Sequence, residues 1–445
     1  MFGTDGIRGV AGEPPLDART VTALGIALGD DLRRRGLAEN PVLIGMDTRE
    51  SGPRIAAQLA EGLRRSGVGV RFAGVVTTPG VAYLTRTGTF SAGVMISASH
   101  NPFRDNGIKV FARTGYKLPD EEEHEIESEI FRLLESTLAP AEPPALIQDF
   151  NARPYLDFLL ATIQGNELNG LRVVIDCGNG AASHLAPQLF REAGAALTVI
   201  HCQPNGRNIN LDCGALHVES LRKAVLDEGA NAGVAFDGDA DRAILISPLG
   251  RIIDGDAMML IAARRLQADG HLAGNLVVST VMSNFGLEKA LGRLGITMLR
   301  TPVGDKYVLE EMLKTGATLG GEQSGHIIFR DGDATTGDGL LTALRVMEIM
   351  ARSGCSLADL VADLKVFPQT IQNVRVREKV PFSQVPAVRN AIEAAEQELN
   401  GNGRVVVRYS GTEALARVMI EAESEAKMRA LVENITKAIQ SSLGL

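Results

Sequence analysis

The amino-acid sequence predicts an α/β protein: three related α/β domains with mixed, mainly parallel sheets, and a smaller C-terminal α+β domain. Three stretches carry this prediction, each with an apolar strand, a Gly/Ser-bearing turn, an amphipathic helix and a second apolar strand; they are residues 41–80, 171–206 and 275–306. Strands joined through a helix in this way pair in parallel. The 445 residues exceed what one hydrophobic core usually supports. We therefore expect four domains, over residues 1–150, 151–252, 253–367 and 368–445.

The C-terminal part has a different pattern. Residues 385–439 read as helix, strand, loop, strand and helix, and we expect the two strands to pair antiparallel across the loop RYSGTEALAR. The preceding segment, 365–376, contains a proline and polar residues, and is predicted to be a hinge. Residues 117–144 read as a charged helix with a Pro-rich exit, in which His124 is a surface residue; the first domain boundary follows it.

Composition excludes several classes of function. The net charge is −9 without a long basic run, Trp is absent and aromatic residues make up 4% of the chain, so no nucleic-acid partner is expected. No apolar run approaches the length of a membrane span and no signal-peptide pattern opens the chain. We expect no membrane partner and a cytoplasmic location, as a monomer or homodimer. The four cysteines lack CxxC spacing and are expected to be reduced, partly buried thiols.

The segment NAGVAFDGDADRAILIS places three carboxylates between two apolar strands. Asp237, Asp239 and Asp241 alternate with small residues, so the backbone can curl and direct all three toward one point. A hard divalent cation would remove their mutual repulsion. An EF-hand loop would need Gly and Glu where this chain has Arg242 and Pro248. We predict bound Mg²⁺, an ion that commonly binds phosphate, with an acidic surface turn as the alternative.

The segment SAGVMISASHNPFRDNGIKVF contains a buried strand, 92–96, that leads into a turn forced by an Asn-Pro pair. Ser99 stands at this turn, where rigid backbone would hold its hydroxyl as a nucleophile or phosphoryl carrier requires. Ser97 shares the same face of the strand and is the competing serine. Lys109 lies ten residues further on, and can return to the site as a general acid/base or as a charge facing phosphate.

A Ser-His-Asp hydrolase is the rival interpretation of this turn. His100 follows Ser99 directly, so in extended backbone its ring would point away from the serine, and no G-x-S-x-G motif occurs. The chain also lacks the P-loop motif, and DCGNGAAS lacks the third glycine of the dinucleotide-binding fingerprint.

Three further loops carry groups that suit a phosphorylated sugar. In RYSGTEALAR, a tight turn offers backbone N–H groups and hydroxyls to an anion, and two arginines flank it. In GEQSGH, a carboxylate, an amide, a hydroxyl and an imidazole share one Gly-bounded loop and suit the hydroxyls and amine of a sugar. The plain alternatives are an ordinary hairpin and an ordinary polar turn. Arg8 lies in a Gly-flanked segment near the N-terminus, which indicates an ordered loop.

Together these motifs resemble the signatures of the α-D-phosphohexomutase superfamily, in that family's order: FGTDGIRG (2–9), ISASHNPFRDNGIK (96–109), DGDADR (237–242), GEQSGH (321–326) and RYSGTEALAR (408–417). They extend over essentially the whole chain. The first motif and Gln323 are most similar to the bacterial members that act on glucosamine phosphates. The resemblance implies four domains around a central cleft, each contributing one loop.

The resemblance also implies a role for each loop. Ser99 would carry the phosphoryl group, and one Mg²⁺ ion would be bound by a phosphoserine oxygen and by Asp237, Asp239 and Asp241. The groups beside the phosphoserine would be Arg8, Lys109 and His100. The sugar-binding residues would be Glu322, Ser324, His326 and Arg242. The phosphate that is not transferred would be bound by Arg408, Ser410, Gly411, Thr412 and Arg417. Two departures from the family pattern, Tyr409 and Ala414, bring the affinity of this last loop into question more than the activity.

The activity implied by the resemblance is interconversion of glucosamine 6-phosphate and glucosamine 1-phosphate, through a phosphoserine and glucosamine 1,6-bisphosphate. This reaction feeds synthesis of UDP-N-acetylglucosamine and cell-wall precursors. A phosphomannomutase/phosphoglucomutase of the same superfamily is the first alternative. A non-catalytic sugar-phosphate sensor is the second, but it would not need three metal-binding carboxylates.

Overall fold

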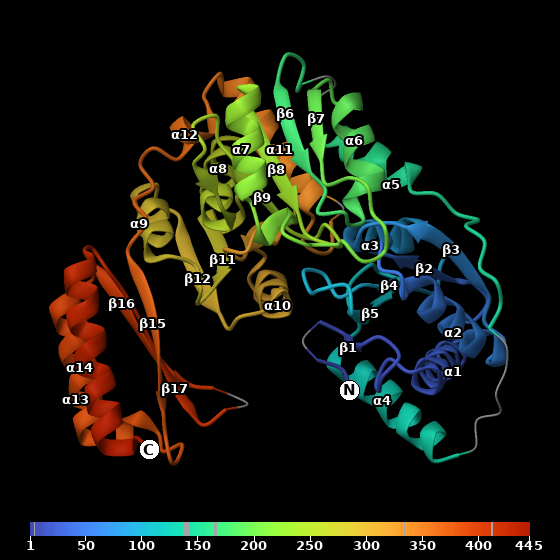
Figure 1. Ribbon diagram of the computed structural model, residues 1–445, viewed down its shortest axis with the longest axis horizontal. Coiled ribbons are helices and arrows are strands. Elements are labelled where there is room, and N and C mark those ends of the chain that lie inside the picture. Colours follow the sequence, from blue (N-terminus) through green and yellow to red (C-terminus); the bar gives the residue numbers. More distant parts are fainter. Residues whose placement is uncertain (4, 137–142, 164–166, 331, 333, 411–412) are drawn as a thin grey trace. The chain divides into compact units, whose positions relative to one another are not determined.

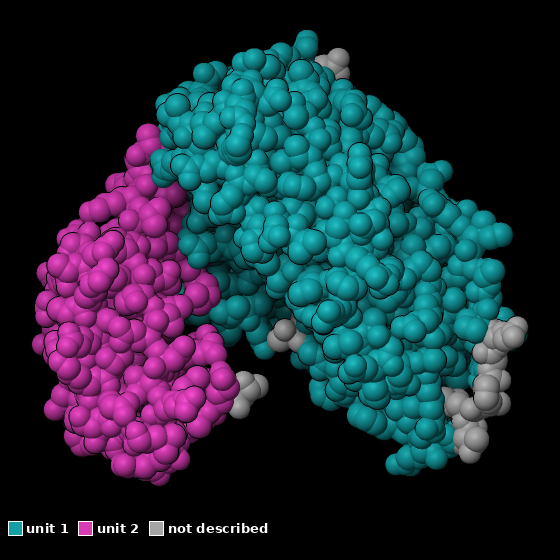
Figure 2. Space-filling view, viewed as in Figure 1, with its two compact units in different colours: residues 1–281, 298–361 teal, residues 282–297, 362–445 magenta. Residues whose placement is uncertain are grey.

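The computed structural model describes all residues except 4, 137–142, 164–166, 331, 333 and 411–412 (Figure 1). The described residues form four sheets. By its internal contacts the chain divides into two compact units, residues 1–281 with 298–361 and residues 282–297 with 362–445 (Figure 2). Among the helices described, none is both long and apolar enough to cross a membrane.

The first sheet has the strand order β1-β5-β4-β2-β3. β2 pairs in parallel with β3 and β4, whereas β5 pairs antiparallel with β4 and β1. All five residues of β4 are buried, which explains why this strand reads as a continuous apolar run. The elements of this part are β1 (Ile7–Val10), α1 (Ala18–Arg34), β2 (Val42–Met46), α2 (Gly52–Arg65), β3 (Val70–Val75), α3 (Thr78–Thr87), β4 (Ala92–Ile96), β5 (Asp105–Ala112) and α4 (Asp120–Glu135).

The second sheet repeats this plan in the order β10-β9-β8-β6-β7. β6 pairs in parallel with β7 and β8, and β9 pairs antiparallel with β8, so the loop between β8 and β9 lies at the carboxyl ends of the parallel strands. Its elements are α5 (Arg153–Ala161), β6 (Arg172–Asp176), α6 (Ala182–Glu192), β7 (Ala196–Ile200), η1 (Gly214–Leu216), α7 (Glu219–Glu228), β8 (Ala232–Phe236), β9 (Ala243–Ile246) and β10 (Ile252–Ile253).

The third sheet has four strands in the order β12-β11-β13-β14. β11 and β13 are parallel, and β13 and β14 form an antiparallel hairpin. Its elements are α8 (Gly255–Ala268), η2 (Ala273–Asn275), β11 (Leu276–Thr280), α9 (Phe285–Arg293), β12 (Thr297–Thr301), α10 (Asp305–Thr315), β13 (Leu319–Gly321), β14 (Ile327–Phe329), α11 (Gly339–Ser353) and α12 (Leu357–Leu360).

The fourth sheet is smaller, with the order β15-β17-β16 and antiparallel pairing throughout. α13 and α14 lie side by side on one face of it (Figure 1). The elements are β15 (Gln369–Arg375), η3 (Phe382–Gln384), α13 (Pro386–Leu399), β16 (Gly403–Tyr409), β17 (Leu415–Ala422) and α14 (Glu425–Leu443). The fold class predicted from the sequence, three α/β domains and a smaller α+β domain, is confirmed.

One local prediction is wrong. The segment 365–376, predicted as a hinge, supplies β15, which pairs with β17 along its whole length. The reason is physical: helices cover one face of this antiparallel sheet, so the polar residues of β15 can face solvent while Val374 is buried.

Candidate active site

The turn after β4 holds Ser99 in a left-handed backbone conformation, with φ of 52°, which is uncommon for a residue other than glycine. The Ser99 N–H donates to the Ser97 hydroxyl (2.9 Å), which itself donates to the Asp47 carboxylate (2.6 Å). Ser97 is therefore occupied in shaping the turn. The Ser99 hydroxyl is buried and donates to Asp237 Oδ2 at 2.6 Å. The structure thus brings the predicted serine and the predicted acidic loop into direct contact.

Sequence reasoning missed the residue that fastens this turn. Arg49, which follows β2, is buried and its Nε donates to Asp47 Oδ2 at 2.8 Å. Its remaining nitrogens donate to four backbone carbonyls of the turn, those of Ser99 (2.9 Å), Asn101 (2.9 Å), Asp105 (3.0 Å) and Pro102. The available signal was a charged Asp-x-Arg directly after a buried strand, at the same sheet edge as Ser99.

His100 does not lie where the sequence indicated. Its Nδ1 lies 3.3 Å from the Ser99 hydroxyl and 3.3 Å from Arg242 Nη1, so the prediction that the ring points away from the serine is wrong. That prediction assumed extended backbone, whereas the positive φ of Ser99 turns the next side chain back. Burial, together with repulsion from Arg242 and Arg8, lowers the pKa of His100, which favours the neutral imidazole.

The loop between β8 and β9 gathers the three aspartates as predicted. One carboxylate oxygen of each of Asp237, Asp239 and Asp241 lies within 4.8 Å of the others, and all three side chains are buried. A Cβ atom on Gly238 would lie 2.4 Å from the Ser99 carbonyl oxygen, so only glycine lets this loop approach the serine turn. Burial raises the pKa of Asp237 well above its usual value, and repulsion from Asp241 and Asp239 raises it further.

This cluster is short of hydrogen-bond donors. Asp239 Oδ1 and Asp241 Oδ1 are buried and accept no hydrogen bond from any residue that the structure describes. The other oxygen of Asp239 accepts from the Thr78 hydroxyl at 2.5 Å, and the Asp239 carbonyl accepts from the Thr78 N–H at 3.0 Å. Buried carboxylate oxygens without donors are costly. They are also the hard oxygen ligands that a divalent cation such as Mg²⁺ prefers, so the donor set fits that ion.

Lys109 supplies positive charge to the cluster. Its ammonium nitrogen lies 3.0 Å from Asp5, 3.0 Å from Asp239 and 3.5 Å from Asp241, and the side chain is buried. Burial lowers the pKa of Lys109, but attraction by Asp239, Asp5 and Asp241 outweighs it, so the pKa stands well above the usual value. Arg8 forms an ion pair with Asp5 and so approaches the same charges.

A ring of alternating charges continues from Asp5. Lys117 Nζ lies 2.6 Å from Asp5 and 2.6 Å from Asp305, and His326 Nε2 lies 3.7 Å from Asp305. The ring closes where His326 Nδ1 lies 3.6 Å from Asp241. Burial lowers the pKa of His326, but attraction by Asp241 outweighs it and raises the pKa to about 9. Sequence reasoning missed Asp5, Lys117 and Asp305 as participants.

Glu322 and His326 of the sugar loop line a cavity of about 420 Å³, whereas Gln323 and Ser324 are not among its lining residues. Glu322 Oε1 accepts from the Gly304 N–H at 3.1 Å, and its Oε2 lies 3.5 Å from the exposed Ser324 hydroxyl. The Gln323 amide reaches Asp254 at 3.4 Å instead of the cavity. The polar lining includes Arg8, His100, Asp241, Arg242, Glu322 and His326.

The predicted phosphate loop lies in the second compact unit. Arg408 on β16 pairs with Arg417 on β17, so both guanidinium groups start from one rung of the sheet. Ser410 is buried, and its carbonyl accepts from Lys379 Nζ at 2.7 Å. Tyr409 stacks on a phenylalanine ring and its hydroxyl donates to a backbone carbonyl at 2.6 Å, so this departure from the family pattern is anchored by packing. The predicted ligands Gly411 and Thr412 lie outside the described residues.

Comparison with known proteins covers the whole chain. Four domain families of phosphoglucomutase/phosphomannomutase match it: alpha/beta/alpha domain I over residues 1–137, domain II over 153–250, domain III over 254–367 and the C-terminal domain over 372–438. Phosphoglucosamine mutase of Solibacter usitatus is 57% identical over 100% of this chain and 99% of its own length. Phosphoglucosamine mutase of Koribacter versatilis is 58% identical over 100% of this chain and 97% of its own.

Solved structures share the fold. A phosphoglucomutase/phosphomannomutase family protein of Burkholderia thailandensis has a TM-score of 0.81 at 24% identity, covering 99% of this chain and 98% of its own. An Aspergillus fumigatus N-acetylphosphoglucosamine mutase, solved with GlcNAc-6P and magnesium, has a TM-score of 0.64 at 18% identity, covering 99% and 95%. Fold and sequence matches together define the class: an isomerase that transfers phosphoryl groups on hexose phosphates. The chain belongs to the α-D-phosphohexomutase superfamily.

Proposed function

We propose that this chain interconverts glucosamine 6-phosphate and glucosamine 1-phosphate, the reaction named for its full-length relatives, and that Ser99 carries the transferred phosphoryl group. The observation that carries the assignment of Ser99 is its hydroxyl, 2.6 Å from Asp237 within a cluster of three buried carboxylates. A hydrolase would need a histidine poised by a carboxylate and an oxyanion hole, not a cluster of acids.

We infer that one Mg²⁺ ion would be held by Asp237, Asp239 and Asp241 together with an oxygen on Ser99. Two carboxylate oxygens without donors support this site, because they are available as ligands. When bound, the ion would neutralise negative charge on the oxygens of the phosphoryl group.

The remaining work falls to side chains around the cavity. The pKa of Lys109 stands well above its usual value, so its ammonium would offset charge on the phosphoryl group during transfer, and attraction by Asp241 raises the pKa of His326 in the same direction. Arg8 and Lys109 would add charge or take up the proton of the attacking sugar hydroxyl, while His100, which lines the cavity, has Nδ1 3.3 Å from the Ser99 oxygen. Glu322 and Arg242 offer a carboxylate and a guanidinium to the sugar from the same cavity.

The reaction then requires the sugar to turn over. Glucosamine 1,6-bisphosphate formed in the first transfer would rebind with its other phosphate at Ser99, and the return transfer would restore the phosphoserine. The phosphate away from Ser99 would be held in the loop of the smaller sheet, by Arg408, Ser410, Gly411, Thr412 and Arg417. Ser324, exposed on the sugar loop, would contact the sugar in both orientations.

We also propose the domain bounds 1–150, 151–252, 253–367 and 368–445. Each family match falls within one of these ranges, which supports them. Small phosphosugar substrates and unpaired cysteine thiols support a cytoplasmic location.

Two measurements test this function. Intact mass spectrometry should find one added phosphate on the protein, lost in Ser99→Ala but kept in Ser91→Ala, which removes a hydroxyl from the other end of the same strand. Turnover of glucosamine 6-phosphate should exceed that of mannose and glucose phosphates and should vanish with Ser99→Ala. Near wild-type turnover by Ser99→Ala would refute the carrier role, and a preference for mannose or glucose phosphates would favour the phosphomannomutase/phosphoglucomutase alternative.

A further inference from the structure

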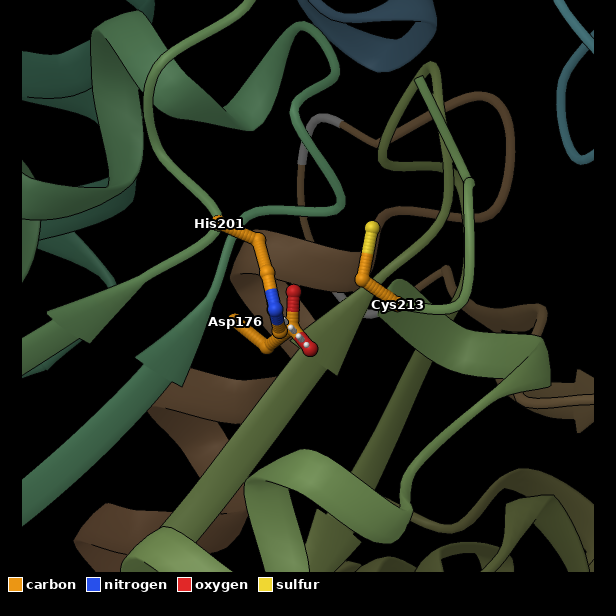
Figure 3. Close-up of side chains that lie close together, drawn as sticks. All are labelled: Asp176, His201 and Cys213. Atoms are coloured by element: carbon orange, nitrogen blue, oxygen red, sulfur yellow. Dashed lines mark hydrogen bonds and ion pairs between the residues drawn. The ribbon is translucent and has the colours of Figure 1, made fainter. Parts of the chain in front are cut away.

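A polar cluster outside the active site lies where β6 and β7 end. Figure 3 shows His201 directed at the carboxylate of Asp176, with Cys213 nearby. Asp176 Oδ2 accepts from His201 Nδ1 (2.9 Å) and from the Gly214 N–H (3.1 Å), and Oδ1 accepts from the Gly178 N–H (2.8 Å). Both oxygens of this carboxylate are thus satisfied within the protein. The cluster holds loops together, and a ligand site is better supported elsewhere, beside the ring of charges.

A cavity of about 480 Å³ lies between the start of α4 and one side of α10. Its volume falls within the range of small-molecule sites, about 300–1,000 Å³. Apolar side chains form much of its wall, among them Leu118, Leu309, Leu313 and Ile328. Leu309 and Leu313 are four residues apart and therefore lie on one face of α10. The cavity can hold an apolar molecular body.

Two lysines line this cavity, and both already have counterions. Lys117 Nζ lies 2.6 Å from Asp5 and 2.6 Å from Asp305, as part of the ring of charges. Asp305 lines both this cavity and the active-site cavity, so the two cavities share one wall residue. Lys306 forms an ion pair with Asp120. The positive charges of the lining are therefore neutralised within the protein.

Three carboxylates of the lining have no such partner. The side chains of Glu121, Glu123 and Glu310 form no ion pair or hydrogen bond with any residue that the structure describes. Glu121 and Glu310 are exposed to solvent, whereas Glu123 is half-buried. Burial raises the pKa of Glu123 to about 7, and attraction by Lys117 offsets this only in part.

The position of Glu123 in the first turn of α4 does not account for this carboxylate. An acid at a helix N-terminus is stabilised in its charged form by the helix dipole, which lowers its pKa. The pKa of Glu123 is raised instead, so burial outweighs the dipole and the charged form lacks a partner. A cation supplied by a ligand would stabilise it.

We propose that this cavity binds a small organic cation, with an ammonium group beside Glu123 and an apolar body against Leu309 and Leu313. Charge selects this class of ligand, because the carboxylates without partners would repel an anion, and a neutral molecule would leave Glu123 without a counterion. A divalent metal ion fits less well. Glu123 belongs to neither group of three potential metal ligands found among the described residues, and hydrocarbon walls supply no ligand oxygens.

The test is isothermal titration calorimetry of the full-length protein with 4-phenylbutylammonium as the probe. 4-Phenylbutanol and 4-phenylbutanoate carry the same aromatic body with a neutral and an anionic head, so they isolate the effect of charge. We expect the ammonium to bind about tenfold more tightly than the alcohol, because a hydrogen bond to a charged group contributes about that much to affinity. The butanoate should bind most weakly of the three.

Substitutions then locate the bound probe. Glu123→Gln keeps the shape of the side chain and removes its charge, so it should weaken ammonium binding about tenfold and leave alcohol binding unchanged. Glu125→Gln is the matched control: it lies on the same helix, pairs with Arg35 at 3.7 Å and does not line the cavity, so ammonium binding should match the wild type. Leu313→Gln, at a position that is 49% exposed, should weaken both ammonium and alcohol by about threefold.

The active-site cavity is the competing location for an organic cation, since Glu322 lines it. Glu322→Gln should leave ammonium binding unchanged. The proposal would be overturned by loss of binding in Glu322→Gln, by full binding in Glu123→Gln, by equal affinities for ammonium and butanoate, or by no ammonium binding at all. The titration uses neither substrate nor turnover, so its failure is distinct from failure of the mutase assignment.

Discussion

Replacing Arg49 with lysine tests how the serine turn is held. The guanidinium makes five hydrogen bonds, one to the Asp47 carboxylate and four to backbone carbonyls between residues 99 and 105. Its five N–H donors are spread over three nitrogens, whereas lysine has three donors on a single nitrogen. Arg49→Lys therefore keeps the charge next to Asp47 but can form at most three of the five hydrogen bonds, while Asn210 still donates to the Ser99 and Asn101 carbonyls.

The expected loss follows from the two missing hydrogen bonds. Each is worth about 0.5–1.5 kcal/mol, so Arg49→Lys should destabilise this part of the chain by roughly 1–3 kcal/mol. For a domain of 150–250 residues, each kcal/mol lowers the melting temperature by about 2–4 °C, which gives a fall of at least about 2 °C. The backbone at Ser99 is also held less firmly when these hydrogen bonds are lost. Turnover should therefore fall by more than the decrease in the fraction of folded protein.

The assay is differential scanning calorimetry, with turnover measured well below the transition. Arg64→Lys is the matched control: that arginine is 68% exposed and pairs with Glu61 at 2.9 Å, so its replacement should cost less than about 1 kcal/mol. Equal melting temperatures for the two variants would show that Arg49 does not hold the turn.

Three further outcomes follow from the geometry. Thr78→Val removes the hydroxyl that donates to Asp239, so the Mg²⁺ concentration for half-maximal turnover should rise about 10–100-fold; an unchanged magnesium titration would contradict this role. Gly180→Ala places a Cβ atom 2.5 Å from the Gly238 carbonyl oxygen, so both the melting temperature and the apparent magnesium affinity should fall. If both stay at the wild-type values, the acidic loop can move away from the added methyl group without loss. The hydrogen bond with Asp176 raises the pKa of His201 above the usual 6.5. The stabilisation that the charged imidazole gives the folded protein is therefore fully present below pH 6.5 and is lost as the pH rises through the raised pKa. The melting temperature of His201→Gln should accordingly change less with pH over that window than the melting temperature of the wild type. The same pH dependence in both proteins would exclude this contribution.

Features that depend on neighbouring residues were predicted from the sequence. A local apolar run predicts the buried strand 92–96, and the spacing of the aspartates predicts the loop from Asp237 to the next strand. The three aspartates converge because small residues separate them. The contact between this loop and Ser99 was expected only through the family resemblance.

Features that depend on distant partners were not predicted. Arg49 has acceptors about 50 residues away, and Thr78 meets Asp239 161 positions further along the chain. In the sequence each looks like an ordinary polar residue next to a strand or helix. His100 was misplaced for a different reason: the direction of its side chain depends on one positive φ, which no side-chain pattern encodes.

The ring of alternating charges restricts how this protein can be rebuilt from parts of its relatives. Asp5 and the two lysines belong to the segment matched by domain I, Asp241 to that of domain II, and Asp305 with His326 to that of domain III. A chimera that imports any one segment from a relative with different residues at these positions would leave a partly or fully buried charged side chain without its oppositely charged partner. Recombination at these boundaries therefore requires that the two parent proteins have matching charged residues at these positions, however similar their backbones are.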